Sequence, residues 1–191
     1  MSEEYDKYNQ TKANVEEELE YDGEIITQPF SPSDIIIKSP PMTMGDLIDM
    51  IREGWINFST EFQTSENLWS LRQQSRLIES ILLGLRLPAF YFEEVYNMQW
   101  KIIDGMQRCC AIRNFCVDKT LTLSDLELLG NAYNGKRYDD LDFATKRDIR
   151  MLPVTVNVLA QGVPGMVKYV LFKRLNTDRI DRTAILKDKN I

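Results

Sequence analysis

The chain has 191 residues, of which 43% are hydrophobic, and its formal net charge is −6. This length suits one ordinary domain with a core of its own, and no apolar run is long enough to cross a membrane. The absence of histidine excludes Ser-His-Asp and Cys-His nucleophiles, zinc sites with histidine ligands and HNH-type nuclease centres. Any chemistry must therefore depend on carboxylates, amides, hydroxyls, Arg, Lys or a bound metal ion.

The negative charge is concentrated at one end of the chain. Residues 1–24 contain nine acidic and two basic residues, whereas residues 25–191 contain twenty acidic and twenty-one basic ones. We therefore predict a flexible acidic leader over 1–24 and a single domain over 25–191. The domain shows no basic stripe of the kind that marks a nucleic-acid interface, although a local arginine pocket is compatible with its composition. The first residues do not form a signal peptide, so we expect a cytoplasmic protein.

The first part of the domain alternates short extended segments with helices. Prolines punctuate an extended entry, in which residues 35–37 are expected to form an edge strand. Thr43 provides a helix cap, and apolar residues then follow at helical spacing until Gly54 ends the helix. After a short apolar stretch and a polar loop, a second helix is predicted from Ser70 to about Leu85. Its core stripe is expected to comprise Leu71, Ile78, Ile81, Leu82 and Leu85.

The second helix also carries a polar side. Arg72, Ser75, Arg76 and Glu79 fall opposite the apolar stripe, and composition alone favours a solvent-exposed face with an ion pair between residues 76 and 79. Gln74 differs from these residues because it projects near the apolar stripe. A buried amide needs hydrogen-bond partners, so we expect Gln74 to find a polar partner inside the protein.

Two strands and a helix form the centre of the chain. Residues 90–95 and 99–103 are predicted to be strands, and the turn-prone pair Asp104-Gly105 is followed by about three turns of good helix formers. A strand, a tight turn and a helix start bring unpaired backbone N–H groups and the positive end of the helix dipole to one place. Asp104 is expected to cap the helix, and Gln107 and Arg108 lie in its first turns. This arrangement suits a phosphate or another anion. The alternative is a hairpin turn at Asp104-Gly105, which the helical pattern after Gly105 disfavours.

Three cysteines lie in this predicted helix, namely Cys109, Cys110 and Cys116. They are odd in number and lack the spacing of metal ligands, so we interpret them as small core residues in a reducing compartment. No zinc site is expected.

The last part of the chain contains a clear strand and a clear helix. A helix is predicted around residues 142–150, and the alternation of Val154, Val156 and Val158 indicates a strand. A further helix begins near Pro164 and carries Arg174 in the middle of its apolar face. An unpaired buried guanidinium costs roughly several kcal/mol, so Arg174 should meet an anion. That anion is either an internal carboxylate or the phosphate of a ligand.

The sequence Asp-Gly-Met-Gln-Arg at 104–108 resembles the Asp-Gly-Gln-Gln-Arg signature of the ParB/sulfiredoxin-like domain in GmrSD-type, modification-dependent restriction proteins. Two further segments are similar to motifs of that family, residues 62–82 upstream and residues 172–177 downstream. The order and spacing agree over about residues 42–177, and three ordered motifs are more specific than one.

The resemblance implies an α+β domain with a small mixed sheet flanked by helices. It also implies a nucleotide or phosphodiester site, in which Asp104 orients a water molecule or a metal ion and Gly105 and Gln107 provide close approach and amide contacts. The phosphate-binding residues implied in this way are Gly105, Gln74, Arg76, Arg174 and Asn176, with Asp104, Gln107 and Arg108 in catalytic roles. The family match likewise raises Glu79 to a candidate for the site.

The family's activities set the functional expectations. Its members hydrolyse nucleoside triphosphates or act on DNA in defence against phage, so the implied ligands are a nucleoside triphosphate with Mg²⁺, or DNA. An effector domain or a partner protein is implied, and no membrane. Met106 stands where the family usually has Gln, Cys109-Cys110 replace Leu-Thr, and Thr64 stands where Arg is usual. These departures support the alternative of a module that binds a nucleotide or DNA without turnover. A regulatory partner whose acidic leader mimics nucleic acid is a third hypothesis.

Overall fold

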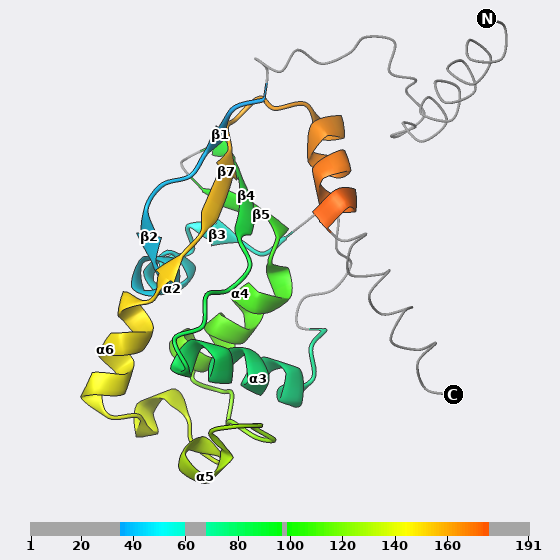
Figure 1. The fold of residues 1–191 in the computed structure, drawn as a ribbon. Coiled ribbons are helices and arrows are strands. Elements are labelled where there is room, and N and C mark those ends of the chain that lie inside the picture. The colour runs from blue at the N-terminus through cyan, green and yellow to red at the C-terminus, as the bar shows by residue number, and fades with distance from the viewer. Residues whose placement is uncertain (1–34, 60–67, 97–98, 176–191) are drawn as a thin grey trace, which may run out of the picture.

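The computed structural model describes residues 35–59, 68–96 and 99–175, and they form a mixed α+β structure (Figure 1). A five-stranded sheet has the order β1-β7-β4-β5-β3. Its strands are β1 (Ile37–Lys38), β3 (Ile56–Asn57), β4 (Phe90–Glu94), β5 (Trp100–Asp104) and β7 (Val156–Leu159). β4 runs antiparallel to β5 and parallel to β7, β1 is antiparallel to β7, and β3 is parallel to β5. This confirms the predicted α+β class.

A second, two-stranded ladder pairs β2 (Met42–Thr43) with β6 (Pro153–Val154). The predicted strand through Val154, Val156 and Val158 is therefore divided between two sheets, with a break at Thr155. All three valines are buried, as their alternation predicts. The extended entry also forms the predicted edge strand, although β1 begins only at Ile37.

The helices begin where side chains cap their first amides. α2 (Met44–Arg52) has a capping box between Thr43 and Asp46, and α3 (Leu71–Leu82) has one between Ser70 and Gln73. α4 (Met106–Ile112) follows β5 and continues into a π-helical segment, Arg113–Val117. The later helices are α5 (Gly130–Tyr133), α6 (Phe143–Met151) and a helix over residues 165–175. Among the described residues, none of these helices combines the length and the apolar character needed to cross a bilayer.

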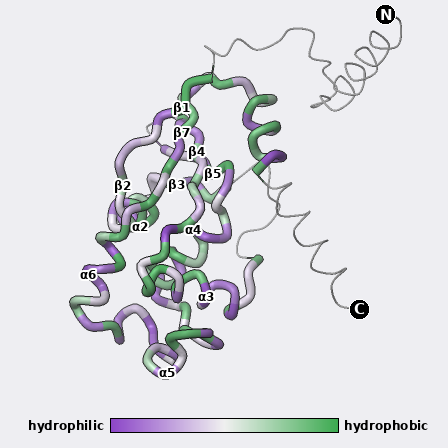
Figure 2. Tube along the Cα trace, in the orientation of Figure 1, coloured by the Kyte–Doolittle hydropathy of each residue, from purple (hydrophilic) through white to green (hydrophobic). Residues whose placement is uncertain are grey.

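The sheet has a covered surface on each side. Phe90, Phe92 and Ile102 belong to the main core, which they share with α2, α3, α4 and α6. Ile103 and Leu159 belong to a second cluster, in which Val167, Leu171 and Phe172 from the helix over 165–175 take part. Figure 2 shows hydrophobic and hydrophilic residues interleaved along this helix and along α3, as expected of helices that bury one face.

The three cysteines are buried in the core, which confirms their structural interpretation. Burial raises the pKa of both Cys109 and Cys116 to about 12. Thiolates are the reactive form of cysteine, so we expect thiol reagents to label these two residues slowly in the folded protein. The helix that holds them is covered on more than one side, since Phe115 is also fully buried and packs edge-on against Tyr138.

The buried face of α3 differs from the predicted one. Leu71 and Leu85, two residues of the predicted core stripe, are 63% and 54% exposed. Ser75 and Glu79, predicted to face solvent, are buried instead. The reason is that the segment after the π-helical turn crosses this side of α3 and donates backbone N–H groups to both residues. Helical periodicity located the polar face of α3, but it did not show that another part of the chain covers that face.

Candidate functional site: the Asp104 turn

Residues 104–106, called the Asp104 turn below, connect the central strand β5 to α4. The predicted sequence of strand, turn and helix is confirmed, and the alternative hairpin is wrong. The prediction that Asp104 caps the helix is also wrong. Gly105 is the N-cap, with a left-handed φ of 105°, and no side chain caps the helix at this position. Asp104 is buried at the end of β5, and its carboxylate accepts a hydrogen bond from the Arg108 side chain.

Asp104 and Arg108 form a buried ion pair. Asp104 Oδ2 accepts a hydrogen bond of 2.7 Å from Arg108 Nη2, and the two side chains are only 7% and 3% exposed. The guanidinium also donates to the backbone oxygen of Ala89 at 3.1 Å and to that of Pro88, and it lies 4.5 Å from the centre of the Phe90 ring. The charge of Arg108 is thus compensated inside the protein, and the pair ties the helix start to the chain that enters β4.

Gly105 is required by both its backbone conformation and its neighbours. A Cβ atom at this position would lie 2.7 Å from Phe90 Cδ1 and 3.3 Å from Arg108 Nη2. The close approach expected at Gly105 is therefore made to the Phe90 ring and the Arg108 side chain.

Substituting Gly105 by alanine is expected to destabilise the protein by about 2 kcal/mol, because a left-handed conformation and an overpacked contact both add cost. Gly84→Ala is the matched control, since Gly84 has a φ of +72° but open space around its Cβ position. Its cost should be about 1 kcal/mol, from the backbone alone. Urea unfolding of both variants measures the difference, and equal losses would show that the contact with Phe90 is unimportant.

The side chains of Gln107 and Gln74 both form hydrogen bonds with the backbone of Trp69. Gln107 Oε1 accepts the backbone N–H of Trp69 at 3.1 Å, and Gln74 Nε2 donates to the backbone oxygen of Trp69 at 2.9 Å. Gln74 is 3% exposed, and its Oε1 accepts from Asn114 Nδ2 at 2.8 Å. The prediction that Gln74 needs an internal polar partner is confirmed. Within the part of the chain that the structure describes, the buried Nε2 of Gln107 has no hydrogen-bond partner.

Arg76 and Glu79 lie further along α3 and take part in different interactions. Arg76 Nη1 forms an ion pair with Glu127 Oε1 at 2.6 Å, in place of the predicted pair with Glu79. The Glu79 carboxylate accepts three backbone N–H groups, from Glu127 at 3.0 Å, Leu128 at 2.7 Å and Leu129 at 2.8 Å. Burial opposes ionisation of Glu79, but these hydrogen bonds and the charge of Arg76 lower its pKa below the ordinary value. Periodicity did not predict this role, because it placed Glu79 on the polar side of the helix, opposite the apolar stripe.

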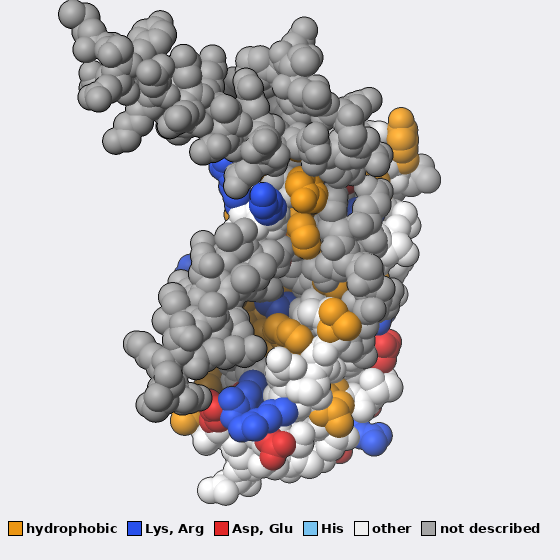
Figure 3. All heavy atoms as spheres, turned by 90° about the vertical axis from the view of Figure 1, so that its right-hand side faces the viewer, with side chains coloured by type: hydrophobic (Ala, Val, Ile, Leu, Met, Phe, Trp, Pro, Cys, Tyr) orange, Lys and Arg blue, Asp and Glu red, His pale blue; other side chains and the backbone are white. Residues whose placement is uncertain are grey.

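Arg174 does not lie on a buried face, contrary to the prediction. It is exposed in the last turn of the helix over 165–175, as is Lys173. The packed stripe of this helix involves Val167, Leu171 and Phe172, so the last turn extends past the surface that it covers. Figure 3 views this side of the molecule and shows Lys and Arg side chains gathered at the end of the helix and in a second group lower on the same face.

Several predicted site residues cannot be compared with the structure. Asn176, the motif residues Phe62, Gln63 and Thr64, and the acidic leader over 1–24 lie outside the described residues. Among the residues that are described, no group of three or more Cys, Asp and Glu side chains is arranged to hold a metal ion. The structure therefore pairs Asp104 with Arg108 next to Gly105, and it links Gln107 to Gln74 through the backbone of Trp69.

The comparisons with known proteins found no relative. No protein-family model matches the chain, and neither a curated protein nor a solved structure matches it.

Proposed function

We propose that this chain is a ParB/sulfiredoxin-like domain that binds the phosphate of a nucleotide or of DNA at the Asp104 turn, without turnover. The observation that carries the proposal is the side-chain amide of Gln107. It lies in the first turn of α4, beside a glycine turn, and its buried Nε2 donor has no partner among the described residues. A buried amide N–H without a partner is costly, and a phosphate oxygen would satisfy it. The dipole at the start of α4 favours the same negative charge.

The state of Asp104 favours binding over hydrolysis. A carboxylate that orients water or a metal ion needs access to the ligand, whereas Asp104 is almost fully buried and accepts a short hydrogen bond from Arg108. Its charge thereby stabilises the turn. In this proposal Asp104 and Arg108 are positioning residues, and Gln107 and the backbone of α4 contact the phosphate.

The family resemblance also suggests a biological role for the proposed binding site. A cytoplasmic role in the restriction of phage DNA fits it, with an effector domain or partner protein that responds to the bound ligand. Mg²⁺ would enter together with the phosphates of a nucleoside triphosphate. Arg174, exposed at the end of the neighbouring helix, is available for the outer phosphate oxygens or for DNA.

The test is a binding panel of nucleoside triphosphates with Mg²⁺ and of short DNA duplexes, scored for affinity and for phosphate release. Gln107→Glu is the decisive variant, because it keeps an oxygen for the Trp69 N–H and replaces the free N–H donor by a negative charge. We expect it to weaken binding at least tenfold, since a hydrogen bond to a charged group contributes about 1.5–3 kcal/mol.

Gln99→Ala is the control, because Gln99 is an exposed glutamine at the other end of β5. It should bind as the wild type does. Phosphate release by the wild type would replace the binding proposal with a hydrolase. If no nucleotide and no DNA binds at millimolar concentration, the proposed function is wrong.

A further inference from the structure

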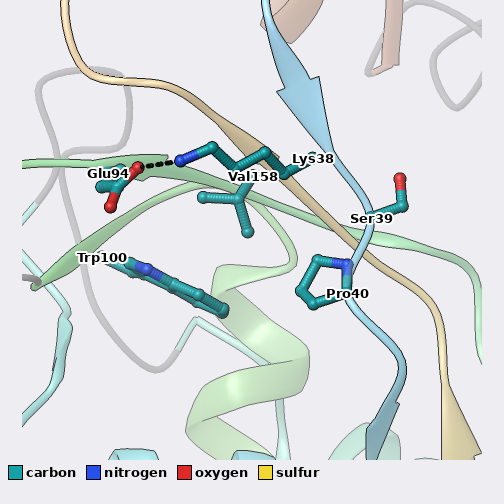
Figure 4. Close-up of a pocket in the computed structure, with 6 residues that line it drawn as sticks. All are labelled: Lys38, Ser39, Pro40, Glu94, Trp100 and Val158. Carbon is teal, nitrogen blue, oxygen red and sulfur yellow. Dashed lines mark hydrogen bonds and ion pairs between the residues drawn. The ribbon is translucent and has the colours of Figure 1, made fainter.

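A pocket of about 410 Å³ lies at the opposite end of β5 from the Asp104 turn (Figure 4). Trp100 begins β5, whereas Asp104 ends it, so the two places are separated by the length of the strand. The pocket is lined by Lys38, Ser39, Pro40, Glu94, Trp100 and Val158. These residues come from β1 and the segment after it, and from β4, β5 and β7, the adjacent strands of the sheet. Its volume falls in the usual range for small-molecule sites.

The walls of the pocket favour a flat ring. Figure 4 shows the Trp100 indole and the Pro40 ring on opposite sides of the space, with Val158 between them. The indole is held in place, because it packs at 5.5 Å from the Phe92 ring and its backbone N–H donates to Trp55. A fixed indole face beside aliphatic groups stacks well with aromatic ligands and loses little entropy when a ligand binds.

The rim of the pocket supplies a donor and an acceptor side by side. Lys38 Nζ donates to Glu94 Oε2 at 3.0 Å, and the side chains are 59% and 30% exposed. An ion pair this exposed contributes little to stability, so a ligand can compete for either partner at small cost. The Ser39 hydroxyl is engaged, since it donates to Asn157 Oδ1 at 2.6 Å. The available polar groups are therefore one ammonium and one carboxylate.

We infer that this pocket binds a heteroaromatic base that stacks on Trp100 and presents a hydrogen-bond donor to Glu94 and an acceptor to Lys38. Nucleobases have this combination of a flat ring with donors and acceptors on adjacent edge atoms. The inference concerns a second site and does not depend on phosphate binding at the Asp104 turn. The base can come from a free nucleoside or from single-stranded DNA, and the two sources share the same ring chemistry.

The experiment uses the full chain and nucleosides, which carry no phosphate. Adenosine, guanosine, cytidine and uridine are titrated against ¹⁵N-labelled protein, in which each of the three tryptophans carries one indole N–H group. We expect at least one nucleoside to shift the Trp100 signal with a saturable curve, and the Trp55 signal to stay in place. Single-stranded oligonucleotides form a second arm. Tighter binding of an oligonucleotide than of the matching nucleoside would identify DNA as the source.

Two variants at the rim of the pocket test whether the ligand binds there. Neither residue is part of the core, so both variants should fold normally. Glu94→Gln and Lys38→Met should each weaken binding of the best nucleoside at least fivefold without changing the fold. Trp55→Leu is the matched control, since Trp55 is 37% exposed and does not line the pocket. The inference is overturned if no nucleoside shifts the Trp100 signal at 5 mM, on the order of the weakest useful affinity. It is equally overturned if both rim variants bind as the wild type does.

Discussion

Replacing Arg108 by methionine is expected to lower the free energy of unfolding by about 3–5 kcal/mol, because it leaves the carboxylate of Asp104 buried without its ion-pair partner. Both side chains are less than a tenth exposed, so water cannot replace the lost hydrogen bond. The backbone oxygens of Pro88 and Ala89 lose their donor at the same time. Urea unfolding of the wild type and the variant measures the effect.

The double variant Asp104→Leu, Arg108→Met separates the energetic effect of the unpaired charge from the effect of lost packing. Buried pairs replaced by apolar residues of similar volume often cost little, so the double variant should recover most of the loss. Arg147→Met is the control, because Arg147 and Asp148 form an exposed pair in which the side chains are 56% and 67% accessible. It should change stability by less than about 1 kcal/mol. A loss for Arg108→Met no larger than this control would contradict a structural role for the pair.

The strand and helix around the Asp104 turn could be predicted because local sequence determines them. Alternating bulky residues specify β4 and β5, and Gly105 provides the left-handed residue that the turn needs. The partner of Asp104 could not be predicted in the same way. Capping and ion pairing are both local options for an aspartate before a helix, and Arg108 is reached only because the carboxylate faces the core.

The polar residues of α3 show a second limit of prediction from helical periodicity. Periodicity places Ser75, Arg76 and Glu79 on one side of the helix, but it does not reveal whether water or backbone meets them. In the structure, the chain at 124–129 crosses that side and turns two of the three into internal hydrogen-bond acceptors. Long-range contacts of this kind leave no pattern in a single sequence.

For Arg174 the error is the opposite one: the helical period predicted a buried residue, and the structure has an exposed one. The helical period correctly gives the apolar face of the helix over 165–175, but it says nothing about how far along the helix the underlying surface extends. Contacts with the sheet involve Leu171 and Phe172, and the next two residues are exposed. The internal partner of Gln74 could be predicted, because a polar residue near an apolar stripe in the middle of a helix has few options except an internal partner.

Glu79→Gln is expected to destabilise the protein by about 3 kcal/mol near neutral pH. The carboxylate accepts three backbone N–H groups, and hydrogen bonds to a charged acceptor are the stronger class. A glutamine offers one oxygen in place of two and directs an N–H₂ group toward the remaining donors. The exposed Glu53 provides the matched control, and Glu53→Gln should change stability by less than about 0.5 kcal/mol.

The difference between the wild type and Glu79→Gln should also depend on pH. Burial would raise the pKa of Glu79, but the N–H groups of Leu129, Glu127 and Leu128 outweigh it, and the pKa lies below the ordinary value of 4.5. A carboxylate with a lowered pKa in the folded state stabilises the protein above its unfolded pKa, and this contribution is lost as the pH falls through the folded pKa. The stability difference between the two proteins should therefore be constant above about pH 6 and shrink steadily below the ordinary pKa. Other carboxylates titrate in both proteins, so they largely cancel in the difference measured by urea unfolding. A difference that grows as the pH falls would mean that Glu79 is held in its neutral form, and that the three backbone donors do not control its charge.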